Sequence, residues 1–161
     1  MASGVSGQMF VLRIGHVFLT IATLLSLGAA RAEAAGYNHL VLSNEAIGGF
    51  DAVSYWRGGE PMPGSRAFRY EWQGTVWLFA NQPDLDAFKA SPQTYAPAFG
   101  GYCAYAMTKG IKADIQPYFF KIEGKKLYFF FSADARDEFA SDPGAIGRAR
   151  DHWSAIERLT Y

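Results

Sequence analysis

The sequence predicts an α+β domain in which a small antiparallel sheet of two hairpins packs with short helices. Two pairs of β-branched and aromatic stretches are each joined by a tight, glycine-containing turn. Each pair is followed by a segment with helix-capping residues and helical spacing of apolar residues. Because hairpins impose antiparallel pairing, this order favours an α+β fold over a doubly wound parallel sheet.

The first hairpin has the clearest pattern. Phe68, Tyr70 and Trp72 alternate with charged residues, which is the period-2 pattern of a half-buried strand. A Gln-Gly pair predicts the turn, and residues 75–80 predict the partner strand. Asn81 is then expected to cap a helix that ends before a Ser-Pro pair.

The second hairpin is predicted over residues 118–123 and 126–131. Ser132 is expected to cap a short helix that runs through Phe139, and an Asp-Pro pair predicts the start of a last helix. Residues 47–56 predict a turn that leads into a short strand. The sequence shows no evident internal repeat.

Residues 1–34 are predicted to be a signal peptide. A short basic lead-in precedes the continuous apolar run of residues 17–27, and Ala-x-Ala patterns follow it. The run is shorter than the roughly 20 residues that span a bilayer, so no stable membrane span is expected after cleavage. The protein is therefore expected to be periplasmic or secreted, with a single domain over residues 35–161.

The composition excludes some classes of partner. The chain has 15 basic and 15 acidic residues, and the basic residues are scattered. Nucleic-acid binding needs a basic surplus, so no nucleic-acid partner is expected. The sequence does not identify a protein partner.

Three motifs carry a family resemblance. Residues 49–55 read G-F-D-A-V-S-Y, residues 95–106 read Y-A-P-A-F-G-G-Y-C-A-Y-A, and residues 124–128 read G-K-K-L-Y. In these motifs the chain resembles exported YHS-domain proteins, over about residues 47–156. The resemblance implies a small α+β fold and implies little about function, because such exported proteins are mostly uncharacterised.

The wider YHS group includes modules linked to heavy-metal handling. The cysteines of those modules correspond to Ser54, Ala80 and Asp84 of this chain, so their thiolates are not retained. A helix-capping role is the preferred interpretation of Asp84. Any soft-metal site must instead involve Cys103, which lies outside that pattern.

Cys103 is the main functional candidate because it is the only cysteine of a chain predicted to reach an oxidising compartment. If the following residues are helical, Cys103 and Met107 share one face, as a thiolate and a thioether would in a Cu(I) half-site. Copper and zinc are the candidate metals. The alternative is core packing, the commoner role of both residue types. We expect a non-catalytic site for a small ligand or soft metal ion near Cys103.

Other roles stay open at this stage. Cys103 is also a candidate thiol nucleophile or redox group, although the sequence places no histidine base beside it. Asp51, Tyr55, Tyr102 and Tyr105 are candidate ligand-binding residues, with an Asx turn and ordinary packing as the alternatives. A structural or protein-interaction module is the third hypothesis, because 16% of the residues are aromatic.

Overall fold

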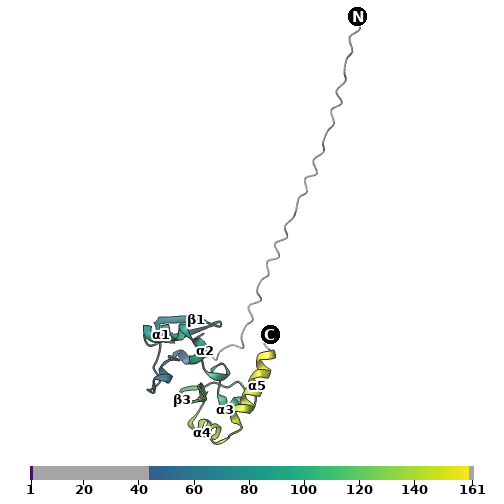
Figure 1. Cartoon of the computed structure of the whole chain (residues 1–161). Helices are drawn as coiled ribbons and strands as arrows, with labels where there is room; N and C mark the ends of the chain where they lie inside the picture. Colours follow the sequence, from purple (N-terminus) through teal and green to yellow (C-terminus); the bar gives the residue numbers. More distant parts are fainter. Residues whose placement is uncertain (2–43, 160–161) are drawn as a thin grey trace. The chain divides into compact units, whose positions relative to one another are not determined.

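The computed structural model describes Met1 and residues 44–159 (Figure 1). The α+β class is confirmed, with helices and two antiparallel two-stranded sheets in residues 44–159. The predicted signal peptide, residues 1–34, lies outside the described residues except for Met1. Among the helices described, none has the length and apolarity needed to cross a membrane.

The first hairpin consists of β1 (Ser65–Trp72) and β2 (Thr75–Phe79), and the helix α1 (Gln82–Ala90) follows it. The predicted alternation holds in β1, where Phe68, Tyr70 and Trp72 are half-buried and the residues between them are exposed. Asn81 caps α1 as expected, since its side chain accepts the N–H of Asp84 at 2.9 Å.

The second hairpin consists of β3 (Gln116–Glu123) and β4 (Lys126–Phe130), and the helix α4 (Ala133–Ser141) follows it. Ser132 caps α4, as the sequence predicts, by accepting the N–H of Ala135 at 3.1 Å. Each hairpin therefore passes directly into a capped helix, and the two hairpins form separate sheets.

These two units are structural repeats. Every strand and helix of the second unit begins and ends 51 residues after its counterpart, from Ser65 to Gln116 and from Ala90 to Ser141. In both hairpins the register shifts between the first and the second pair of facing residues, which is typical of a β-bulge. The expectation of no internal repeat is wrong, because the turns, caps and apolar positions recur while most residue identities differ.

Shorter elements connect the two units. Two turns of 3-10 helix, η1 (Ile47–Gly49) and η2 (Ser54–Arg57), precede the first hairpin. The predicted strand in residues 47–56 is therefore wrong. The side chain of Asp51 accepts the N–H groups of Val53 and Ser54, which stabilises a local turn instead of a strand ladder.

The second unit is preceded by the short helices α2 (Pro92–Tyr95), η3 (Ala98–Gly101) and α3 (Ala104–Met107). The last described helix is α5 (Ala145–Leu159), which is also the longest helix of the described residues. Helix α5 packs against α3 and α4, and Figure 1 shows these three helices side by side.

Aromatic side chains fill the core of both units. Phe88 of α1 is fully buried and lies 4.8 Å from Trp77 and 5.1 Å from Phe79, measured between ring centroids. At the equivalent position of α4, Phe139 lies 5.7 Å from Tyr128 and 5.3 Å from Phe130. Each unit thus closes its hairpin against its own helix through one phenylalanine.

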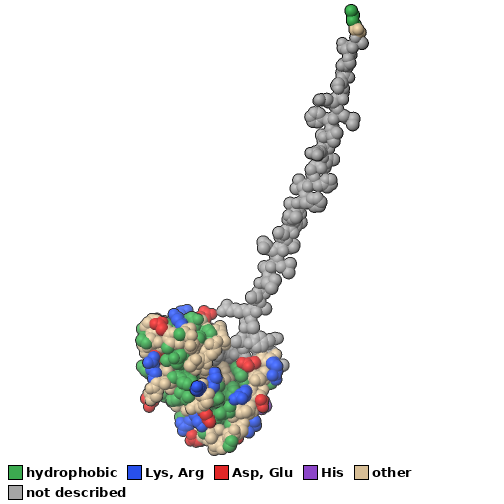
Figure 2. Space-filling view, viewed as in Figure 1, with side chains coloured by type: hydrophobic (Ala, Val, Ile, Leu, Met, Phe, Trp, Pro, Cys, Tyr) green, Lys and Arg blue, Asp and Glu red, His purple; other side chains and the backbone are tan. Residues whose placement is uncertain are grey.

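On the face that Figure 2 shows, neither sign of charge dominates among the described residues. The visible face carries acidic and basic side chains of both signs, interspersed with apolar ones (Figure 2). This distribution agrees with the formal net charge of zero.

Candidate functional site

Cys103 lies in the core at the start of α3. Its side chain is fully buried, and its N–H donates to the carbonyl of Ala113 at 2.9 Å. It also forms an isolated parallel bridge with Phe129 of β4. The carbonyl of Cys103 accepts the N–H of Met107 at 3.0 Å, so these residues have the predicted helical spacing. Met107 is fully buried as well.

The donors around Cys103 do not fit a soft metal ion. Across residues 44–159, no three His, Cys, Asp or Glu side chains are grouped closely enough to hold a metal. Cys103 and Met107 together supply two sulfur atoms inside a closely packed apolar core. Soft-metal sites built on thiolates usually complete their coordination with further Cys or His ligands.

The positions of the YHS cysteines do not form a soft-metal site either. The Ser54 hydroxyl donates to the carbonyl of Asp51 at 2.8 Å and accepts the N–H of Met62 at 3.1 Å. The carboxylate of Asp84 is paired with Arg57 and also accepts from Asn81. These oxygen atoms are therefore committed to holding the loops before and after the first hairpin.

Asp51 is a buried carboxyl with a structural role. One oxygen accepts the N–H of Val53 at 2.8 Å, and the other accepts the N–H of Ala80 at 2.9 Å. Burial raises the pKa of Asp51 from 3.8 to about 6, against the lowering effect of these hydrogen bonds, and Asp84 raises the pKa further. Asp51 thus ties the turn before the first hairpin to the end of β2.

Tyr55 is also part of the core. Its ring packs edge-on against Phe120 at 4.9 Å and Phe129 at 5.0 Å, and its hydroxyl donates to the carbonyl of Pro117 at 3.1 Å. Burial strongly raises the pKa of this phenol. Tyr55 therefore joins the segment before the first hairpin to the sheet of the second unit.

Tyr102 and Tyr105 differ from the preceding candidates because both are partly exposed. The ammonium of Lys109 lies 4.3 Å from the ring centroid of Tyr105 and donates to its hydroxyl at 3.0 Å. The ammonium of Lys112 lies 5.0 Å from the ring centroid of Tyr102. Burial raises the pKa of Tyr102, and the negative charge of Asp114 adds to this effect.

A second aromatic ring completes the environment of Lys112. Trp153 of α5 lies 6.2 Å from Tyr102 between ring centroids, and the Lys112 ammonium is 5.6 Å from the Trp153 ring. We call Tyr102 and Trp153 the aromatic clamp. The sequence predicted Tyr102 as a site residue but not Trp153 or Lys112. Trp153 lies on α5 and Lys112 in an irregular segment, both outside the sequence motif that contains Tyr102.

Asp51 and Cys103 occupy corresponding backbone positions in the segments before the two hairpins, with an offset of 52 residues where the hairpins have 51. Each lies two residues after a run of three residues with positive φ, which are 45°, 66° and 79° for residues 47–49 and 54°, 61° and 79° for residues 99–101. The backbone N–H of Asp51 donates to the carbonyl of Met62 at 2.9 Å, and that of Cys103 donates to the carbonyl of Ala113 at 2.9 Å. The two residues that the sequence singles out are thus the same structural position in two copies.

Comparison of the chain with protein-family models, with curated proteins and with solved structures found no match. The resemblance to YHS domains therefore stays a prediction from the three sequence motifs.

Proposed function

We propose that the protein is a non-catalytic binding domain that works outside the cytoplasm and contacts a small ligand through the aromatic residues flanking Cys103. The location follows from the predicted signal peptide of residues 1–34. The contact surface is supported by one observation: Tyr102 and Tyr105 are partly exposed and each has a lysine ammonium over its ring, whereas Cys103 between them is fully buried.

The burial of Cys103 supports a binding role over thiol chemistry. A nucleophilic or redox cysteine needs access to its substrate and a group that favours the thiolate. The Cys103 side chain is 0% exposed and is surrounded by apolar core residues. In such an apolar environment a cysteine side chain packs as a small hydrophobe.

Alkylation with iodoacetamide tests the non-catalytic part of this proposal. We expect Cys103 to stay unmodified in the native protein at neutral pH and to react fully after denaturation in guanidinium chloride. Mass spectrometry of the intact protein measures both states. Native alkylation as fast as that of free cysteine would contradict the proposal and favour thiol chemistry.

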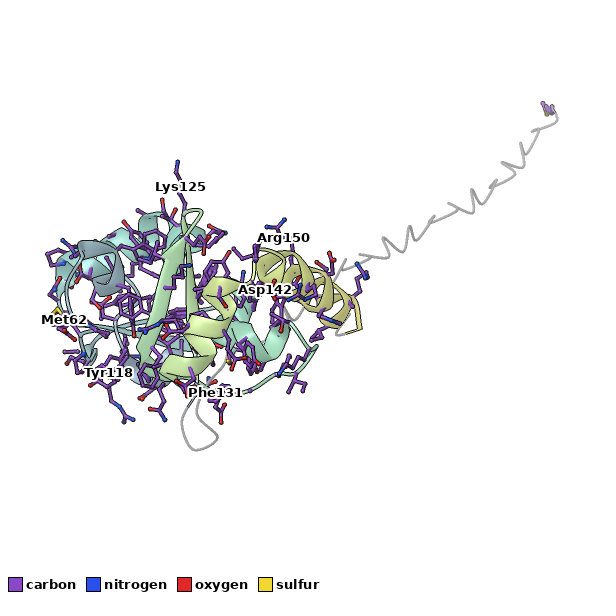
Figure 3. The ribbon with its side chains drawn as sticks, turned by 90° about the horizontal axis from the view of Figure 1, so that it is seen from below. Met62, Tyr118, Lys125, Phe131, Asp142 and Arg150 are labelled. Atoms are coloured by element: carbon purple, nitrogen blue, oxygen red, sulfur yellow. The ribbon has the colours of Figure 1, made fainter. Side chains whose placement is uncertain are left out.

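Native mass spectrometry of protein purified from the exporting compartment tests the binding part. We expect the wild-type protein to carry a non-covalent small molecule that is lost in Tyr102→Ala. The matched control is Tyr118→Ala, because Tyr118 is an exposed tyrosine of strand β3. Figure 3 shows it well apart from Arg150, which marks α5, the helix that carries Trp153 beside Tyr102. This control is expected to retain the molecule. A wild-type protein without a bound molecule, or equal retention by Tyr102→Ala, would contradict the proposal.

A further inference from the structure

In the aromatic clamp, one cation lies beside two neighbouring rings and within reach of both. The ammonium of Lys112 lies 5.0 Å from the centroid of Tyr102 and 5.6 Å from that of Trp153, both within the roughly 6 Å over which a ring face attracts a cation. The two rings are 6.2 Å apart and inclined at 43°. Lys109 and Lys89, by contrast, each lie over a single ring.

The walls of the clamp are anchored, whereas its occupant is not. Trp153 belongs to the 15-residue helix α5 and packs at 6.5 Å on the buried Phe99. The N–H of Tyr102 donates to the carbonyl of Phe99 at 3.1 Å. Lys112 is exposed and lies in the irregular segment between α3 and β3. Opening the clamp therefore requires only rotation of one flexible side chain.

The rings are the only partners of the Lys112 ammonium within residues 44–159. No carboxylate forms an ion pair with it there, and no acceptor of the described residues takes a hydrogen bond from it. The two ring faces offer the N–H donors of a primary ammonium no oxygen or nitrogen acceptor. A cation with methyl groups in place of N–H donors needs no such acceptor and is still attracted by the rings.

We propose that the aromatic clamp of Tyr102 and Trp153 is a binding site for a quaternary ammonium group, which Lys112 occupies as an internal substitute until a ligand displaces it. This inference rests on the proposed ligand-binding function and gives its ligand a chemical class. Aromatic rings recognise quaternary ammonium groups through their negative faces. The negative charge of Asp114 adds to the effect of burial in raising the pKa of Tyr102, so the electrostatic field near this ring also favours a cation.

Titration with tetramethylammonium chloride tests this inference. The signals of the Trp indole N–H groups are followed by NMR, with sodium chloride at equal concentration as the salt control. In Lys112→Gln, which removes the internal cation, we expect saturable binding about tenfold tighter than in the wild-type protein. Lys89→Gln, which removes the cation over the single ring of Tyr70, is expected to leave the affinity unchanged.

Variants of the clamp provide the second arm. In the Lys112→Gln background, Trp153→Leu is expected to abolish binding, and Trp153→Phe to weaken it while the melting temperature stays close to that of its parent. No saturable shift in Lys112→Gln, or equal affinity with Trp153→Leu, would overturn the inference. The proposed function would survive this result if native mass spectrometry still detects a molecule that depends on Tyr102.

Discussion

Replacing Asp51 by asparagine is expected to remove a pH dependence from the free energy of unfolding. The pKa of Asp51 rises from 3.8 to about 6 on folding, chiefly because the carboxyl is buried. Between about pH 4 and pH 6 the unfolded chain loses this proton while the folded protein keeps it. The folded state then binds more protons, so the free energy of unfolding falls as the pH rises through this window.

The size of the effect follows from the pKa values. A rise from 3.8 to about 6 corresponds to about 3 kcal/mol between the two protonation states. The neighbouring Asp84 is paired with the exposed Arg57, which moderates its repulsion of Asp51, so we expect about 2 kcal/mol to be observed. Asp51→Asn also replaces one acceptor oxygen by a donor, which costs about 1–3 kcal/mol at every pH.

Urea denaturation followed by circular dichroism measures this dependence at several pH values between about 4 and 6.5. We expect the wild-type protein to exceed Asp51→Asn in stability at about pH 4, and this difference to shrink by about 2 kcal/mol by pH 6.5. A difference that is constant or grows with pH would refute the assignment of a raised pKa to Asp51.

Asp142→Asn is the matched control. This carboxylate is paired with Arg148 and accepts the N–H of Gly144, and both interactions lower its pKa below 3.8. Asp142 is therefore ionised in both the folded and the unfolded protein above about pH 5. We expect the stability difference between wild type and Asp142→Asn to stay nearly constant above about pH 5, where that of Asp51→Asn continues to shrink.

The repeated architecture supplies two further predictions with internal controls. Asn81→Ala and Ser132→Ala each remove an N-cap and are expected to lower the free energy of unfolding by about 1 kcal/mol, with the larger loss at Asn81 because it also donates to Asp84; the reverse order in urea denaturation would contradict this. Phe88→Leu is expected to lower the melting temperature more than Phe139→Leu, because Phe88 also packs against the rings of β1; equal shifts in calorimetry would contradict this.

The sequence predicted those features of the fold that depend on local signals. Alternation in residues 68–72, glycine-containing turns and the caps Asn81 and Ser132 each act within a few residues, so both hairpins and their helices could be located. The predicted strand before the first hairpin was wrong because a side chain, Asp51, supplies the hydrogen bonds that decide the local conformation. The repeat was missed because it is conserved in geometry more than in residue identity.

The candidate site was predictable only in part, and the reason is tertiary. The helical spacing of Cys103 and Met107 followed from the sequence, but burial of both side chains depends on β4 and α5 packing around α3. Tyr102 was selected because it precedes the cysteine. Its partner Trp153 lies 51 residues later in the sequence, on α5, and Lys112 lies in an irregular segment. No local sequence pattern predicts that these three residues meet.

The repeat also changes how the lone cysteine is interpreted. Cys103 occupies before the second hairpin the backbone position that Asp51 occupies before the first, after a similar run of positive φ values. In the first unit this position faces backbone N–H groups and holds a carboxylate. In the second it lies against Phe129 in an apolar core, where a carboxylate would be costly and a neutral thiol is a good filler. Packing alone therefore accounts for an unpaired cysteine in a protein predicted to be exported, and the binding role that we propose rests on its partly exposed neighbours.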